Sequence, residues 1–401
     1  MLIDDLKEKL INSIDLTQEI SDAQLQEMIS EMVMREFSAG LMGVHEKMQM
    51  CRELFNSIRG MDVLQEMLED DSITEIMVNG PEDIFVEREG MLYRYAGAFS
   101  SKEKLEDIVQ SVAAKTNKRI NEASPVMDAR LKDGSRINIV LEPIAIGGPV
   151  ITIRKFPKKA IDVNALISMG TMTDEAAGFL RRLIEAKYNI FISGGTGTGK
   201  TTMLNALSGF IPPEERIVTI EDSAELRIEN SPDLVRLECR QKNTEGENAV
   251  SIRDLIRTSL RMRPDRIIVG EVRGAEALDM LQAMNTGHEG SLSTGHANSV
   301  QDMLSRLEVM AMMSGEDIPL AAIRRQISSA IDIMIHLERM RNGQRKLVSI
   351  SQIEGITDGE IITSPIFEYD RGHAGNKGRG LIRTGIRLVK LKGGMTDDQE
   401  C

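Results

Sequence analysis

One glycine-rich segment, GGTGTGKT at residues 194–201, restricts the fold of this 401-residue chain more than any other feature. It fits the phosphate-binding pattern G-x-x-x-x-G-K-[ST], in which glycines let the main chain wrap so that its N–H groups point at phosphate oxygens. The strand-like run NIFIS precedes it, and the helical pattern KTTMLNALSG follows. A helix N-terminus at that point adds partial positive charge. The segment therefore predicts a nucleotide-binding strand, loop and helix.

The residues of this loop predict the ligands of a Mg²⁺–ATP complex. Lys200 can reach the β- and γ-phosphates, and the Thr201 hydroxyl can bind Mg²⁺. ATP and Mg²⁺ are therefore the expected cofactors. The expected nucleotide-binding residues are Gly194, Gly195, Thr196, Gly197, Thr198, Gly199, Lys200, Thr201 and Thr202.

A second strand-like run, RIIVGE at residues 266–271, supplies a candidate catalytic carboxylate. Hydrolysis needs a group that orients or deprotonates water. Glu271 stands at the carboxyl end of the run, where ligands collect in an open parallel sheet, and it is the predicted general base. Gly270 stands where many such strands carry an Mg²⁺-binding aspartate, so another acid must help to hold the metal.

The segment IVTIEDSAEL offers that acid. Glu221 and Asp222 end the predicted strand, and Glu225 follows shortly after. Carboxylates gathered at one strand edge repel one another unless a cation or an arginine neutralises them. Glu221 and Asp222 are therefore assigned, with Thr201, to Mg²⁺ and its water shell, and Glu221 is also counted as catalytic. The alternative is that these acids cap the next segment.

Two of the five histidines, His288 and His296, flank the short run SLST. His296 is predicted to sense the γ-phosphate by donating a hydrogen bond, whereas His288 can equally be structural. A zinc site is the alternative, but no cysteine or third ligand accompanies the pair. The three cysteines lie far apart and form no CxxC pair, so neither a zinc site nor a disulfide framework is indicated.

Composition bears on the partners. The net charge is −13, the chain has no Trp, and aromatic residues make up 3%. A nucleic-acid motor usually carries a basic face and stacking aromatics, so no stable nucleic-acid partner is expected. No apolar run approaches the length of a membrane span, and the first residues lack a signal-peptide core. The expected protein is cytoplasmic, without direct membrane insertion, and reaches the inner face of the cell membrane through partners.

Four regions are expected along the chain. Residues 1–65 look helical, with a helix after a Ser21 or Asp22 cap. Residues 70–157 look like a mixed α+β domain that ends at the turn FPKK. Residues 165–356 alternate strand-like and helical runs, which predicts a parallel sheet covered by helices on both faces. Residues 357–401, around GHAGNKGRG, are expected to form a C-terminal β appendage.

In combination, the motifs resemble the type II/type IV secretion ATPases over roughly residues 72–356. TIEDSAEL, RMRPDRIIVGEVRGAEALDMLQAMNTGHEGS and STGHANS look like the Asp box, Walker B motif and His box of that family. The upstream runs ITEIMVNGPEDIFVEREG and RINEASPVMDARLKDGSRINIVLEP extend the resemblance. The most similar branch is the CpaF-like Tad/Flp pilus assembly ATPases. The four-cysteine metal insertion of some type II relatives is missing, which agrees with a Tad or type IV assignment.

This resemblance implies an α/β protein with a C-terminal RecA-like P-loop ATPase domain, a preceding PAS-like α+β domain and an N-terminal helical bundle. It also implies a homohexameric ring in which ATP binds between the N-terminal and RecA-like domains. Arginines of the N-terminal domain then complete the site at the γ-phosphate, and the matching positions are Arg136, Arg154 and, less closely, Arg130. In one departure from the family, Gly295 precedes His296, where a bulkier apolar residue is usual.

The leading hypothesis is therefore a hexameric ATPase that drives Tad/Flp pilus assembly or protein secretion by acting on an inner-membrane platform protein. The alternative is the same kind of ATPase acting on the cargo of a type IV, conjugation-like secretion system. A nucleic-acid motor fits the acidic composition less well. A scaffold that binds ATP without hydrolysing it does not explain Glu271 and the acidic segment.

Overall fold

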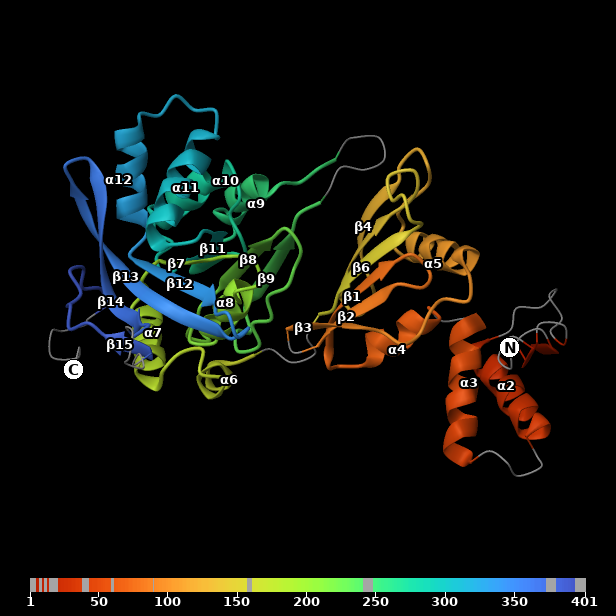
Figure 1. The fold of residues 1–401 in the computed structure, drawn as a ribbon. Coiled ribbons are helices and arrows are strands. Elements are labelled where there is room, and N and C mark those ends of the chain that lie inside the picture. The colour runs from red at the N-terminus through yellow and green to blue at the C-terminus, as the bar shows by residue number, and fades with distance from the viewer. Residues whose placement is uncertain are drawn as a thin grey trace. The chain divides into compact units, whose positions relative to one another are not determined.

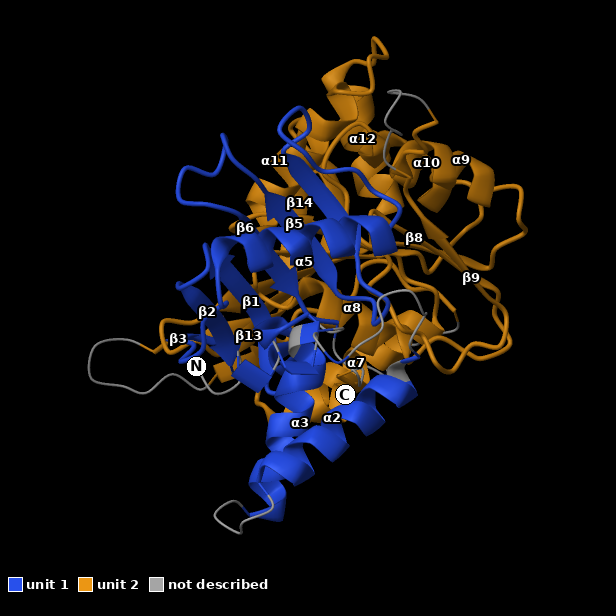
Figure 2. Cartoon of the chain, turned by 90° about the vertical axis from the view of Figure 1, so that its right-hand side faces the viewer, with its two compact units in different colours: residues 1–158 blue, residues 159–401 orange. Residues whose placement is uncertain are grey.

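The chain folds into two units, residues 1–158 and residues 159–401, which Figure 2 colours separately. The computed structural model describes residues 5–6, 9–10, 13, 21–37, 43–58, 61–88, 90–156, 161–240, 248–372 and 380–393. Outside these residues lie most of the predicted helical segment before Ser21, the PKK of the FPKK turn, most of the GHAGNKGRG stretch and Cys401. None of the described helices is long and apolar enough to span a bilayer.

The first unit begins with helices and continues into an antiparallel sheet (Figure 1). The helices are α2 (Asp22–Glu36), α3 (Val44–Ile58), α4 (Val63–Glu69) and α5 (Lys102–Lys115). Helix α2 begins where the sequence predicts, because the Ser21 side chain accepts a hydrogen bond from Gln24 N and the Gln24 side chain bonds back to Ser21 N. Apolar residues of α2 and α3 form a small core of their own.

The sheet of the first unit has the order β3-β2-β1-β6-β5-β4. Apolar residues of α4 and α5 pack with one another and with the sheet in a single core. The pattern of the sequence predicts four of the six strands, and misses the exposed β3 and β4, in which a single residue is buried. The strands are β1 (Ile73–Asn79), β2 (Ile84–Arg88), β3 (Met91–Arg94), β4 (Val126–Arg130), β5 (Arg136–Val140) and β6 (Val150–Arg154).

The second unit is built on a nine-stranded mixed sheet of order β15-β14-β13-β12-β7-β11-β10-β8-β9. The six strands from β12 to β9 are parallel, as the sequence predicts. The last three strands pair antiparallel and continue the same sheet beyond β12. The strands are β7 (Ile190–Gly194), β8 (Ile217–Glu221), β9 (Leu234–Glu238), β10 (Arg266–Val269), β11 (Leu292–His296), β12 (Ile333–Arg339), β13 (Arg345–Thr357), β14 (Glu360–Asp370) and β15 (Gly380–Arg383).

Helices cover both faces of this sheet (Figure 1). The side chains of strand β7 explain why. Ile190 and Ile192 belong to a core with α6, α7 and α8, whereas Phe191 belongs to a separate core with α9 to α12. Successive side chains of a strand point to opposite faces, so the side chains of a continuous apolar run pack in two cores, one on each face. The helices are α6 (Val163–Ser168), α7 (Asp174–Glu185), α8 (Lys200–Ser208), α9 (Ile252–Ser259), α10 (Glu276–Met284), α11 (Val300–Met312) and α12 (Leu320–Ala330).

Candidate functional site

The phosphate-loop segment joins β7 to α8 at the carboxyl edge of the parallel strands. Gly199 precedes the helix with φ 93°, a left-handed conformation that a side chain would strain. Thr198 Oγ1 donates to Gly195 O at 2.9 Å and closes the turn. The predicted strand, loop and helix are therefore all present. The N-terminus of α8 faces the edge where β8, β10 and β11 also end.

Lys200 is the first residue of α8, and its side chain reaches back into the phosphate loop. Its side chain is buried, and Nζ donates to the carbonyl oxygens of Gly194 at 3.1 Å and Gly195 at 2.8 Å. Nζ also lies 3.2 Å from Nδ1 of His296, because β11 pairs with β7 in a register that sets His296 opposite Gly194. The predicted phosphate-binding lysine and the predicted γ-phosphate sensor are thus in direct contact.

This contact favours one protonation form of His296. An ammonium group can only donate, so Nδ1 accepts from Lys200 and the ring proton resides on Nε2. Burial lowers the pKa of His296, and the positive charge of Lys200 lowers it further. A neutral imidazole with its N–H at Nε2 is therefore the favoured form. Nε2 lies 2.9 Å from Oε1 of Glu271.

Glu271 links the histidine to a second cation. Its Oε2 accepts from Nη2 of Arg273 at 2.8 Å, and Nη1 of the same guanidinium lies 3.7 Å from Oδ2 of Asp222. The Oε1 atom is buried and has no aligned hydrogen-bond donor among the described residues, although His296 is close. In the predicted base, Oε2 is therefore hydrogen-bonded to Arg273, whereas Oε1 can accept a proton.

Glu221 is the more buried acid of the Asp box, with 3% of its surface exposed. Its Oε1 accepts from the backbone N–H groups of Glu225 at 2.7 Å and Leu226 at 3.0 Å. Its Oε2 is buried and has no partner within the described part of the chain. Desolvation raises the pKa of Glu221. A cation brought to Oε2 would offset that cost.

Gly270 explains how Glu221 reaches the edge. A Cβ atom on Gly270 would lie 2.9 Å from Cγ of Glu221, so a side chain and the glutamate cannot share this space. The strand that commonly carries a metal-binding aspartate here carries glycine, and the neighbouring strand supplies the carboxylate.

These oxygens fit Mg²⁺ better than a softer metal. Mg²⁺ commonly binds through one or two carboxylates together with substrate phosphates, and Thr201 and Glu221 Oε2 would supply such oxygens. Asp222 is half exposed and faces Arg273, so it is the weaker candidate. The described residues contain no group of three or more His, Cys, Asp or Glu side chains that could hold a metal by themselves. The zinc alternative thus gains no support from the described residues.

The two histidines of the predicted pair lie at opposite ends of their strand. His288 precedes β11, and its Nδ1 contacts Ala283 O at 3.3 Å near the end of α10, which is the structural role.

The departure from the family pattern at Gly295 also has a physical reason. A Cβ there would lie 2.9 Å from Sδ of Met303 and 3.0 Å from Cε1 of Phe191, so these two side chains fill the space of the usual bulkier residue.

The three arginines indicated by the family resemblance belong to the first unit. Arg136 on β5 is paired in register with Arg154 on β6 and with Arg130 on β4. Cross-strand partners lie on the same face of a sheet, so the three form one row across neighbouring strands.

Two residues near the loop were missed by the sequence patterns. Arg273 follows Glu271 by two positions, and that spacing was the available signal. His336 on β12 is buried beside the loop strand, with Nδ1 2.8 Å from Oγ of Ser193. A histidine inside the apolar run IDIMIHL was the signal in this case.

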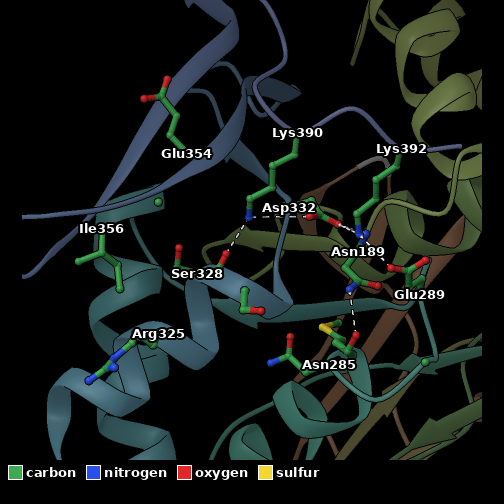
Figure 3. A pocket seen from close by; sticks show the side chains of 14 residues that line it. Asn189, Asn285, Glu289, Arg325, Ser328, Asp332, Glu354, Ile356, Lys390 and Lys392 are labelled. Carbon is green, nitrogen blue, oxygen red and sulfur yellow. Dashed lines mark hydrogen bonds and ion pairs between the residues drawn. The ribbon is translucent and has the colours of Figure 1, made fainter. Parts of the chain in front are cut away.

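A cavity of about 560 Å³ lies at the other edge of the sheet (Figure 3). Asn189 precedes β7 and Asp332 precedes β12, so the cavity is at the amino ends of these strands, away from the phosphate loop. Asp332 accepts from Asn189 N at 2.9 Å and from Lys392 Nζ at 2.8 Å. Lys390 Nζ donates to Ser328 O at 2.8 Å, so these polar groups tie the C-terminal segment to the sheet.

Comparisons with known proteins show the family of the chain. The family described as "Type II/IV secretion system protein" matches residues 58–380. A putative conjugal transfer protein of Mycobacterium tuberculosis (strain CDC 1551 / Oshkosh) is 35% identical over 338 residues, covering 83% of this chain and 95% of the relative. The type IV secretion system protein PtlH of Bordetella pertussis (strain Tohama I) is 36% identical over 324 residues, covering 74% and 95%.

A solved structure supports the fold. The pilus retraction motor PilT with bound ADP has a TM-score of 0.52 and 20% sequence identity to this chain. The similarity covers 74% of this chain and 83% of the motor. Both chains therefore share the α/β fold with mixed sheets described here.

Proposed function

The chain belongs to the type II/IV secretion system protein family and is an ATPase, and we propose that it uses ATP hydrolysis to drive a type IV, conjugation-like secretion system. The family resemblance seen in the motifs is thereby confirmed. The observation that carries the proposed mechanism is the position of Glu271. Its buried Oε1 lies 2.9 Å from His296, which contacts Lys200 of the phosphate loop.

In this mechanism each side chain has one role. The loop N–H groups and Lys200 bind the phosphates. Thr201 and Glu221 would hold Mg²⁺, which neutralises charge on the β- and γ-phosphate oxygens. Glu271 accepts a proton from, or orients, the attacking water. The Nε2–H group of His296 donates toward the γ-phosphate when the ring turns from Glu271 to the nucleotide.

The proposed cargo differs from the one that the motifs favour. The motifs favour Tad/Flp pilus assembly, with a type IV secretion system as the alternative. The relatives named above are a conjugal transfer protein and a type IV secretion protein, and both are covered over 95% of their length. This coverage favours the alternative, and pilus assembly becomes the second candidate.

The assembly is also part of the proposal. The second unit would act as a RecA-like motor domain, the sheet of the first unit as its PAS-like partner, and α2 and α3 as a helical module for protein contacts. Six copies would form a ring, bound at the cytoplasmic side to a membrane platform protein. The row of Arg130, Arg136 and Arg154 would then approach the γ-phosphate on closure and couple hydrolysis to movement.

Native cells carrying Glu271→Gln test the choice of cargo. The measurements are DNA transfer to recipient cells, secreted protein, and surface filaments by electron microscopy, at matched protein levels. Loss of transfer or secretion with filaments intact supports the conjugation-like system. Loss of filaments with transfer and secretion intact would favour pilus assembly instead.

A further inference from the structure

We propose that Arg273 is a positioning residue that clamps one oxygen of Glu271, so that the other oxygen is presented to the attacking water. This role rests on the proposed function, because it presupposes that Glu271 is the base of ATP hydrolysis.

The clamp joins two acidic strand ends. Nη2 of Arg273 lies 2.8 Å from Oε2 of Glu271, which follows β10, and Nη1 lies 3.7 Å from Oδ2 of Asp222, which follows β8. The planar guanidinium thus makes one hydrogen bond to Glu271 and one longer ionic contact to Asp222, and these two contacts together orient it. Its charge also offsets the repulsion between the two acids.

The backbone that carries Arg273 is itself held from two sides. The N–H groups of Arg273 and Gly274 both donate to Oε1 of Glu276, at 2.7 Å and 2.8 Å. One residue earlier, Val272 N donates to Thr294 O on β11 at 2.9 Å. The turn is therefore anchored to the start of α10 and to the neighbouring strand, and the guanidinium extends from a fixed base.

The consequence is an asymmetric carboxylate. Oε2 of Glu271 is occupied by Arg273, while Oε1 is buried, close to His296 and without an aligned donor among the described residues. A carboxylate free to rotate would exchange its oxygens and lose the orientation needed by a water that must lie in line with the γ-phosphate. Arg273 therefore acts on the reaction through Glu271 and need not touch the nucleotide.

A double-mutant cycle separates this role from a general structural one. Turnover of Mg²⁺–ATP by the full chain is measured in wild type, Arg273→Gln, Glu271→Gln and the double variant, with single-turnover radiolabelled ATP for the slow variants. Arg273→Gln alone is expected to lower kcat about 10- to 100-fold. In the Glu271→Gln background the same change should alter the rate less than about twofold, because coupled residues are not additive.

Two further readouts complete the test. Binding of a fluorescent ATP analogue should change less than about twofold in Arg273→Gln, and Arg273→Lys should restore part of kcat because it keeps the charge but loses the fork. Arg216 is the matched control, since its guanidinium pairs with Asp233 just before β8 and β9, at the opposite edge of the sheet from Glu271. Arg216→Gln should leave kcat within about twofold.

The outcomes are distinguishable. An equal effect of Arg273→Gln in both backgrounds, or a loss of nucleotide affinity as large as the loss of kcat, overturns the positioning role alone. Wild-type turnover in the Glu271→Gln single variant overturns the proposed base, and the positioning role with it.

Discussion

The side chain of Glu221 occupies the space beside Gly270, where a Cβ atom would lie 2.9 Å from the glutamate Cγ. Val269 of β10 pairs in parallel with Ile220 of β8. The residues that come next, Gly270 and Glu221, therefore lie side by side. The acid that fits the metal thus comes from the Asp box, and the glycine of the Walker B strand makes the room for it.

Gly270→Ala should therefore impair catalysis by displacing Glu221. We expect kcat to fall at least about tenfold, with nucleotide affinity changed less, because the loop and Lys200 are untouched. Steady-state kinetics across Mg²⁺ concentrations would check this, and the concentration required for half-maximal activity should rise. Gly355→Ala is a control for placing alanine at a glycine, since no atom lies within 4 Å of its added Cβ and its backbone does not have a positive φ. Unchanged kinetics in Gly270→Ala would contradict the shared space.

Lys200→Ala should abolish nucleotide binding or hydrolysis while the fold remains. The ammonium group is the phosphate ligand, and its contacts in the structure are to two loop carbonyls and His296. Binding of a fluorescent ATP analogue should weaken at least about tenfold. Lys132→Ala, at an exposed site of the other unit, should bind normally. Loss of the native circular dichroism spectrum in Lys200→Ala would instead assign the lysine a structural role.

Acid should destabilise the ATPase unit through His336. Burial lowers the pKa of His336 below its ordinary value of 6.5. The unfolded state then binds a proton more readily than the folded state as the pH falls below 6.5, so the free energy of unfolding decreases. Urea denaturation at about pH 7.5 and about pH 5.5 should show this loss, and His336→Asn should reduce it. The pKa of His296 is also lowered, so part of the loss should remain.

His288→Asn is the control for that experiment. This histidine follows α10, and its Nδ1 lies 3.3 Å from the backbone carbonyl of Ala283. The variant should keep the full dependence on pH. A dependence that disappears in His288→Asn but persists in His336→Asn would contradict the assignment.

Breaking the buried ion pair between Arg266 and Glu215 should strongly destabilise the second unit, because it leaves a buried charge without its partner. Arg266 has no exposed surface, and its Nε and Nη2 donate to the two carboxylate oxygens at 2.5 Å and 3.1 Å. Arg266→Met leaves Glu215 without this partner and should cost about 3–5 kcal/mol in urea denaturation. Arg216 pairs with Asp233 at the surface, and Arg216→Met should cost ~0–1 kcal/mol. Equal losses of unfolding free energy in the two variants would contradict the expectation that burial of the ion pair sets the cost.

The sequence predicts the parts of the site that local pattern encodes. The loop from Gly194 to Thr201 and the carboxylate of Glu271 each follow an apolar strand, and strand ends can be read from neighbouring residues. The contact of Lys200 with His296 joins residues 96 positions apart and depends on β11 lying beside β7. Strand order is set by long-range packing, which a single sequence does not display.

The same limit explains the C-terminal strands. A C-terminal β appendage is the expectation for residues 357–401, because the strand pattern there follows a complete set of alternating strands and helices. In the structure, β14 and β15 of this segment pair antiparallel next to β13 and thereby join the sheet of the second unit. Alternation of strand and helix reveals the parallel part of a sheet, whereas antiparallel extensions can be added without changing that pattern.

The role of Glu271 as the base of Mg²⁺-dependent ATP hydrolysis is tested most directly by phosphate release from wild type and Glu271→Gln. ATP affinity is determined for both, and Mg²⁺ is removed by chelation as a second arm. We expect wild type to hydrolyse ATP only with Mg²⁺, and the variant to bind ATP normally while its kcat falls at least about 100-fold. Turnover that survives Glu271→Gln at the wild-type rate would contradict the account.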